Sequence, residues 1–138
     1  MKHVGFTGTR SGMTSEQKST VRQLFMKYRF TLHHGDCVGA DADAHDLARE
    51  AGAAHIVVHP PIKNDLRAFK SGDELRTPKS YFARNRDIVN EAHLLVATPF
   101  TAHETQGGTW YTINYARKRK AAGDPITIII VLPDGTKE

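Results

Sequence analysis

The chain repeats one local pattern three times: a short apolar segment leads into a glycine-containing loop, and a helical segment follows. The pattern occurs at residues 2–28, 30–52 and 93–121. Glycine lets a loop turn sharply and approach a ligand closely. A strand, a glycine loop and a helix N-terminus together form the geometry by which open α/β sheets hold phosphorylated ligands. We therefore expect the three loops to meet at one edge of one sheet, and we look for the functional site there.

Hydrophobic periodicity predicts five strands and four helices. The first helix has Val21, Leu24, Phe25 and Tyr28 at the spacing of a single buried face. The last strand is apolar on both faces, as a buried parallel strand should be. The predicted strands are residues 2–7, 30–34, 55–59, 93–98 and 126–132, and the predicted helices are residues 15–28, 41–50, 80–91 and 108–121.

Alternating strands and helices predict a parallel sheet with helices on both faces. Right-handed crossovers favour the strand order 3-2-1-4-5, which is a single Rossmann-like three-layer domain over residues 1–138. Residues 62–79 are polar and contain Gly72 and Pro78. We expect this segment to be either a functional lid loop or disordered.

The composition is that of an ordinary globular domain, with 39% hydrophobic and 25% charged residues. The longest apolar run, residues 126–132, is too short to span a bilayer, and no basic and apolar leader opens the sequence. Cys37 is the only cysteine, so no intrachain disulfide is possible. We expect a cytoplasmic protein without a membrane partner. The net charge of +4 is compatible with an anionic partner or with a solvated, lysine-rich surface.

The first and third loops are candidates for binding phosphate. Backbone amides at Gly8 and Thr9 and the Thr9 hydroxyl would hold the anion, and Arg10 would add a two-pronged donor. The alternative is a tight turn with Arg10 in solvent. The third loop has a glycine pair and a hydroxyl at a positive helix end, where an anion is favoured, although such a pair also occurs in plain turns. These residues are Gly107, Gly108 and Thr109.

The second loop is too acidic for a simple phosphate cradle. Gly35 and Gly39 let it turn near the ligand. We assign Asp36 to a sugar hydroxyl or a base edge, as the acid after the second strand does in dinucleotide folds. Asp41 is better placed to cap the following helix than to contact a ligand. Glu104, in the loop before the helix predicted at residues 108–121, is a further carboxylate that would act as a base.

The helix at residues 80–91 carries polar groups on or beside its apolar face. They are Arg84, Asn85 and Arg86. Polar groups in that position need partners, and a bound anion would supply them. The alternative is that the arginines reach water and that Asn85 bonds the backbone.

The eight histidines show no metal-binding spacing, so we expect no metal site and no cofactor. Residues 117–120 are basic and lie at a helix C-terminus, where positive charge is favoured. A solvated helix end explains them, and a nucleic-acid surface formed with Arg84 and Arg86 is the alternative. That alternative predicts strongly salt-dependent binding.

Taken in order, these motifs resemble the SLOG superfamily of Rossmann-like domains. It includes the DNA-processing protein A (Smf) family, the Lonely Guy phosphoribohydrolases and small proteins of the YspA type. Residues 8–10 look like the first glycine loop of the DNA-processing family. Residues 39–45 are similar to its G-x-D-x-x-A-H segment, and residues 82–88 to its F-x-R-N-R-x-I segment.

The resemblance implies a nucleotide or nucleotide-derived ligand, with residues 107–109 in the phosphate-binding loop. It also implies a homodimer as a candidate assembly and cleavage of an N-glycosidic bond as a candidate reaction. Thr112 occupies the position of the phosphoribohydrolases' catalytic glutamate. Asp36 and Glu104 are then the candidate catalytic carboxylates. A single-stranded nucleic-acid-binding module is the alternative function.

Overall fold

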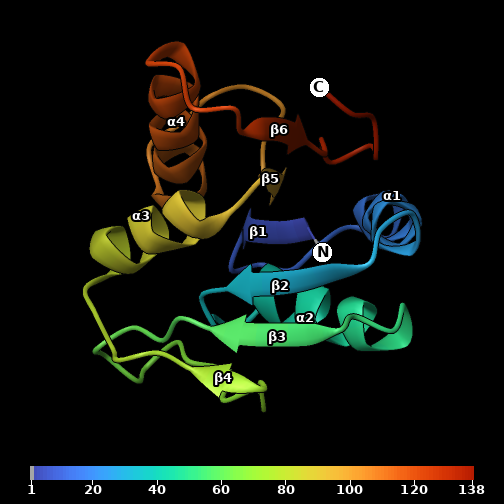
Figure 1. The fold of residues 1–138 in the computed structure, drawn as a ribbon. Coiled ribbons are helices and arrows are strands. Elements are labelled where there is room, and N and C mark those ends of the chain that lie inside the picture. Colours follow the sequence, from blue (N-terminus) through green and yellow to red (C-terminus); the bar gives the residue numbers. More distant parts are fainter. Residues whose placement is uncertain (1) are drawn as a thin grey trace.

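The computed structural model describes residues 2–138, and strands alternate with helices along most of them (Figure 1). The elements in chain order are β1 (Lys2–Gly8), α1 (Ser15–Met26), β2 (Phe30–His34), α2 (Ala40–Glu50), β3 (His55–Val58), β4 (Glu74–Leu75), α3 (Tyr81–Glu91), β5 (Leu94–Thr98), α4 (Gly108–Ala121) and β6 (Thr127–Ile130).

The strands form one parallel sheet in the order β4-β3-β2-β1-β5-β6. The order predicted for the five strands is confirmed. The prediction of five strands was one too few, because residues 62–79 contribute β4 at the edge. Glu74 pairs with Val57 and Leu75 with Val58, so the segment is part of the sheet and the expectation of disorder is wrong. The short length of β4 and its polar neighbours hid it from the periodicity analysis.

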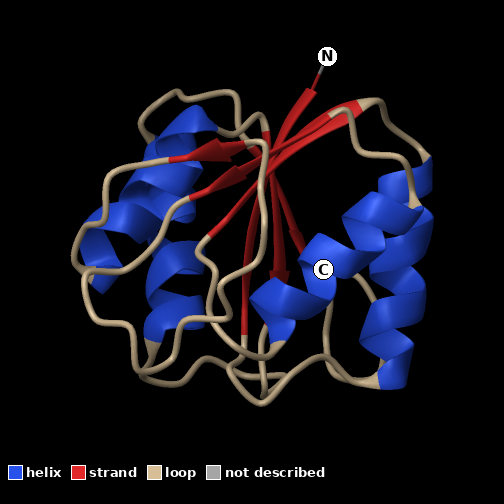
Figure 2. Ribbon diagram, turned by 90° about the horizontal axis from the view of Figure 1, so that it is seen from below, coloured by secondary structure: helices blue, strands red, loops and turns tan. Residues whose placement is uncertain are grey.

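Helices cover both faces of the sheet (Figure 2). On one face α1 packs beside α2, and on the other α3 packs beside α4. Side chains of β5 alternate between the two cores: Val96 belongs to the α1–α2 side, whereas Leu95 packs with Val89 of α3 and Ala116 of α4. Because both faces of the central strands are buried, their sequences are continuous apolar runs.

Local signals place the helix ends. Thr14 and Gln17 form a reciprocal capping box at the start of α1, and Ser80 caps α3 through a bond to the Ala83 amide. Gln17 also reaches across to β5 and β6, because its side-chain nitrogen donates to the carbonyls of Pro99 and Val131 at 3.0 Å each. The ends of α1, β5 and β6 are thereby fixed together.

None of the helices in residues 2–138 has the length and apolar character that crossing a membrane requires.

Candidate functional site

A cavity of about 380 Å³ opens at the C-terminal edge of the sheet, beside the ends of β1 and β5. These two strands are neighbours, and from β1 the chain proceeds outward in one direction through β2 and β3 and in the other through β5 and β6. Ligands of open α/β sheets bind at such a reversal of strand order. The loops after β1, β2 and β5 and the N-terminal parts of α3 and α4 form the walls.

Most of the residues predicted as ligand-binding line this cavity. They are Gly8, Thr9, Arg10, Gly35, Asp41, Arg84, Asn85, Gly107, Gly108 and Thr109. Asp36, Gly39, Arg86 and Glu104 lie outside it, and so does all of residues 62–79. No residue of the segment 62–79 lines the cavity, and the two predicted catalytic carboxylates are both absent from its walls.

Asp36 has a structural role instead of the expected contact with a ribose or a base. Its carboxylate is fully buried. It accepts hydrogen bonds from Arg67 Nε at 2.7 Å and from the Lys70 amide at 2.9 Å. The backbone of Asp36 is left-handed, with φ at 57°, which turns the side chain toward the 62–79 segment. The acid after β2 thus holds the sheet edge in place. The sequence pattern identified its position but not its direction.

The other three outlying residues also contact other parts of the protein. Gly39 is the N-cap of α2 and packs against the main chain of Arg10. Arg86 donates from Nη1 to the Tyr111 hydroxyl at 2.8 Å, which joins α3 to α4. Glu104 is exposed, and its carboxylate is 3.9 Å from Arg117. These contacts correct the expectation that all three would touch the ligand.

The loop after β1 is packed too tightly to offer all of the predicted phosphate donors. The Thr9 amide donates to the Thr98 carbonyl at 3.1 Å, and the Thr9 hydroxyl accepts from the Ser11 amide at 3.2 Å. A β-carbon at Gly8 would lie 2.3 Å from Thr98 Oγ1. Arg10 is exposed at the cavity rim, so it is the cation of this loop that a ligand can reach.

Arg84 is buried and fastens α3 to the loop after β2. Its Nη1 donates to the carbonyls of Gly35 and His59, its Nη2 lies 3.1 Å from Cys37 Sγ, and its Nε donates to Asn85 Oδ1 at 2.5 Å. A β-carbon at Gly35 would lie 2.5 Å from Arg84 Nη1, so glycine is required for this contact. Most N–H groups of Arg84 therefore donate to protein atoms, and the side chain forms part of the cavity wall.

The N-terminus of α4 is the strongest anion-binding feature of the cavity. Across residues 2–138, no side chain caps this helix, and its first turn has no acidic residue. Gly107 has φ at 137° and Gly108 follows it, so the first amides are approachable from the cavity. Asn85 uses Oδ1 to accept from Arg84, which leaves Nδ2 as a donor, 3.9 Å from where a β-carbon of Gly108 would be.

Asp41 is the one carboxylate among the lining residues that the structure describes. It does not cap α2 as predicted: its Oδ2 accepts from the Cys37 amide at 3.2 Å, and the helix has no side-chain cap. Burial raises the pKa of Asp41 to about 6, although the Arg84 charge works in the opposite direction. Burial and the Asp41 charge also raise the pKa of the Cys37 thiol, so Cys37 stays protonated at neutral pH.

Sequence analysis missed the aromatic part of the walls. Phe6, Tyr81, Phe100 and Trp110 line the cavity, with Thr7, Cys37, Ile88, Thr105 and Gln106. The Tyr81 ring lies beside two guanidinium groups, with the Arg10 and Arg84 carbons 5.3 and 5.4 Å from its centroid. A signal was present, because Trp110 directly follows the third glycine loop and Phe100 lies two residues after β5.

The basic run at residues 117–120 lies at the opposite end of α4 from the cavity. Arg119 pairs with Asp124 at 2.6 Å, and Arg117 lies over the Trp110 ring, 5.8 Å from its centroid. The other two cations of the nucleic-acid alternative bond protein groups: Arg84 donates to the Gly35 carbonyl and Arg86 to the Tyr111 hydroxyl.

No family model matches the chain, and no curated protein matches it in sequence. Solved structures do share its fold. A molybdenum cofactor binding protein from the phototrophic bacterium Rippkaea orientalis is 18% identical, with a TM-score of 0.71 over 95% of this chain and 76% of that one. The molybdenum cofactor carrier protein of Chlamydomonas reinhardtii is 19% identical, with a TM-score of 0.63 over 95% and 75% of the two chains.

A structural-genomics target named TM1055 is 21% identical, with a TM-score of 0.61 over 84% of this chain and 68% of that one. Similarity at this level of identity shows the fold alone. The fold and the cavity therefore define the class: a Rossmann-like three-layer α/β domain with its pocket at the C-terminal edge of the sheet.

Proposed function

We propose that this chain binds a nucleotide or nucleotide-derived small molecule in the cavity at the ends of β1 and β5. The phosphate lies against the first amides of α4, at Gly108 and Thr109, with Arg10 closing from the opposite loop. Asn85 Nδ2 supplies a further donor between them. The heterocycle lies along the aromatic wall formed by Tyr81, Phe100 and Trp110.

The uncapped N-terminus of α4 is the observation that carries the proposal. Its free amides and the helix dipole attract an anion, and Gly107 and Gly108 leave room for one. Aromatic and arginine side chains at the same cavity suit a planar ring system joined to that anion. The two molybdenum cofactor proteins that share the fold support a small molecule as the ligand.

Binding and hydrolysis make different predictions for this site. Asp36 and Glu104 lie outside the cavity, so we assign neither of them a role in N-glycosidic bond cleavage. Asp41 is the carboxylate that a cleavage reaction would have available. A binding protein returns AMP intact after incubation, whereas a hydrolase releases the free base and loses that activity in Asp41→Asn.

Thermal melting against AMP, ADP-ribose and a short single-stranded oligonucleotide tests the proposal. A ligand at 100 times its Kd adds about 2.7 kcal/mol to the free energy of unfolding, which is a shift of several degrees for a chain of this size. Trp110 is the only tryptophan and lines the cavity, so its fluorescence reports occupancy directly. We expect a mononucleotide to raise the melting temperature and change this fluorescence.

Arg10→Gln and Arg86→Gln form a matched pair of variants. Arg10 lines the cavity, whereas Arg86 bonds Tyr111 outside it. Losing a charge-assisted hydrogen bond costs about 1.5–3 kcal/mol, so Arg10→Gln should weaken binding roughly 10- to 100-fold. Arg86→Gln should leave binding unchanged. Equal effects of the two variants, or a shift with the oligonucleotide alone, would refute the proposed site.

A further inference from the structure

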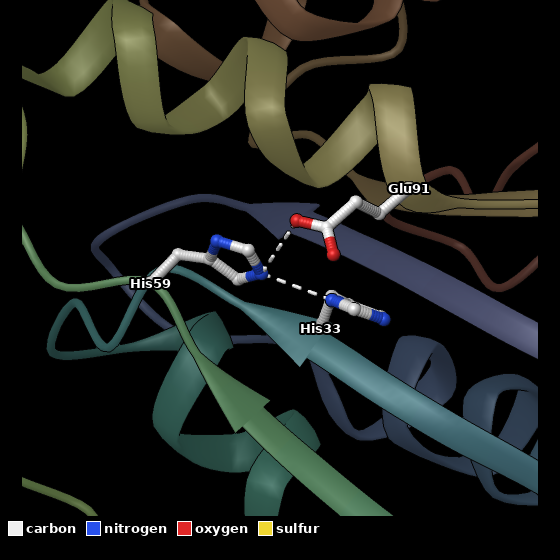
Figure 3. Close-up of side chains that lie close together, drawn as sticks. All are labelled: His33, His59 and Glu91. Atoms are coloured by element: carbon white, nitrogen blue, oxygen red, sulfur yellow. Dashed lines mark hydrogen bonds and ion pairs between the residues drawn. The ribbon is translucent and has the colours of Figure 1, made fainter. Parts of the chain in front are cut away.

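A second group of functional side chains lies between the sheet and α3, outside the cavity (Figure 3). His33 is on β2, His59 directly follows β3, and Glu91 is the last residue of α3. Both imidazoles are buried, and Glu91 is partly buried. The three residues are far apart in sequence, so no motif of the metal-binding kind could reveal them.

The three side chains converge on one small volume. His33 Nδ1 and His59 Nε2 are 2.9 Å apart, and His59 Nε2 is 3.9 Å from Glu91 Oε2. One ligand atom from each residue lies within 4.8 Å of the other two. Zinc ligands at about 2.0–2.2 Å in a tetrahedral site are about 3.3 Å from one another. Displacements of less than about 1 Å would therefore bring these atoms to that spacing.

The donor set is one that transition metals use. Two imidazole nitrogens and one carboxylate, with a fourth position open, are the protein ligands of many zinc sites. A neutral imidazole offers a metal the lone pair of one ring nitrogen, so an ion between His33 and His59 would replace the hydrogen bond that joins them.

Contacts around the cluster orient its members. His33 Nε2 lies 2.8 Å from His3 Nδ1, which is the kind of partner that fixes the tautomer of a metal-bound histidine. Arg76 donates to both oxygens of Glu91, at 2.7 and 2.8 Å, and also bonds Glu74. Arg76, Glu74 and Glu91 together have one positive and two negative charges. A divalent cation would offset the net negative charge of these three side chains.

We propose that His33, His59 and Glu91 form a binding site for a divalent transition-metal ion of the zinc type. The ion ties the C-terminal end of α3 to β2 and to the residue after β3. The same stretch is joined to the ligand cavity, because the His59 carbonyl accepts from Arg84 at 3.0 Å. This site is independent of the proposed nucleotide pocket, since none of its residues lines that cavity.

Cobalt titration of tag-free, chelator-treated protein tests this proposal. We expect one Co²⁺ per chain, with visible absorption bands that Zn²⁺ abolishes, and a melting temperature that rises with Zn²⁺. Glu91→Gln and His59→Gln should each weaken the metal affinity by roughly 100-fold or more, because second-shell losses alone cost about 10- to 100-fold. His103→Gln is the matched control, since His103 is exposed on the loop after β5.

Absence of saturable binding, or binding retained in both ligand variants, would overturn the proposal and leave a hydrogen-bonded row of histidines. X-ray absorption on the zinc-loaded wild-type chain keeps the test decisive if a variant fails to fold. We expect nitrogen and oxygen ligands, including two imidazoles. A sulfur ligand would place the ion at Cys37 and would also overturn the proposal.

Discussion

Replacing Asp36 by asparagine tests whether this buried acid stabilises the fold or contacts the ligand. The carboxylate is fully buried and pairs with Arg67 at 2.7 Å, and it accepts from the Lys70 amide at 2.9 Å. Asparagine is close in size, accepts the same amide and tolerates the left-handed backbone. The substitution therefore removes the charge and little else.

The cost follows from the burial of the pair. Removing one partner of a buried ion pair costs about 3–5 kcal/mol, because the other charge stays buried without compensation. The Arg67 side chain is 15% exposed and regains some hydration. We therefore expect about 2–4 kcal/mol for Asp36→Asn. Asp46→Asn is the control, because it breaks an exposed pair with Lys70. This control should cost less than about 1 kcal/mol.

Urea unfolding followed by far-ultraviolet circular dichroism measures both variants, with the denaturant slope checking that the unfolded state is unchanged. A double-mutant cycle with Arg67→Met should give a coupling energy of about 1 kcal/mol or more. Nucleotide affinity should stay at the wild-type value, because Asp36 lies outside the cavity. Equal costs for Asp36→Asn and Asp46→Asn, or a loss of affinity without a loss of stability, would refute this reasoning.

Three further substitutions test other parts of the structure. Gly39→Ala places a β-carbon 2.2 Å from the Arg10 carbonyl oxygen at φ +90°, whereas Gly52→Ala, at φ +76°, meets open space. In urea unfolding we expect Gly39→Ala to cost about 2 kcal/mol or more and Gly52→Ala to cost about 1 kcal/mol. Gln17→Ala leaves the Pro99 and Val131 carbonyls without their donor, while Gln23→Ala changes an exposed position. The first should cost about 2–4 kcal/mol and the second about 0.5 kcal/mol or less. Asp41 has a pKa of about 6 against an ordinary 3.8, so the native state holds more protons between these values. The contribution of Asp41 to stability therefore falls as the pH rises through this interval, by up to roughly 3 kcal/mol, whereas the lowered pKa values of His33 and His59 contribute with the opposite sign. Asp41→Asn removes this contribution, so unfolding titrations should show stability rising more steeply with pH between about 4 and 6 in the variant than in the wild type; an unchanged slope would refute the role of Asp41.

The sequence predicted the sheet well because its signals are local. Apolar runs marked the central strands, and crossover handedness fixed their order without any knowledge of contacts. The edge strand β4 escaped because Glu74 and Leu75 are exposed and their pairing with β3 is backbone pairing, which leaves no hydrophobic pattern. Strand ends and loops were therefore predictable, whereas the path of the polar segment 62–79 was not.

The site was predictable as a location and less so as a set of side-chain directions. Their positions at the glycine loops indicated that Arg10 and Gly108 would line the cavity, and its place beside the apolar face of α3 indicated the same for Asn85. The direction of Asp36 depends on a left-handed backbone and on Arg67, which is distant in sequence. Arg84 faces the expected region, but its donors are taken by main-chain carbonyls that only the folded chain brings near.

The position of β1 in the sheet has a consequence for folding. Its residues pair with β2 on one side and with β5 on the other, so Val4 lies opposite both Leu32 and Leu94. During synthesis, the second edge of β1 has no partner until the chain has been extended by some ninety residues. Contacts this distant in sequence slow folding and prolong the exposure of an unpaired strand. Although β1 is synthesised before the other strands of this sheet, its second edge is paired late, and the growing sheet is most exposed to aggregation before β5 emerges.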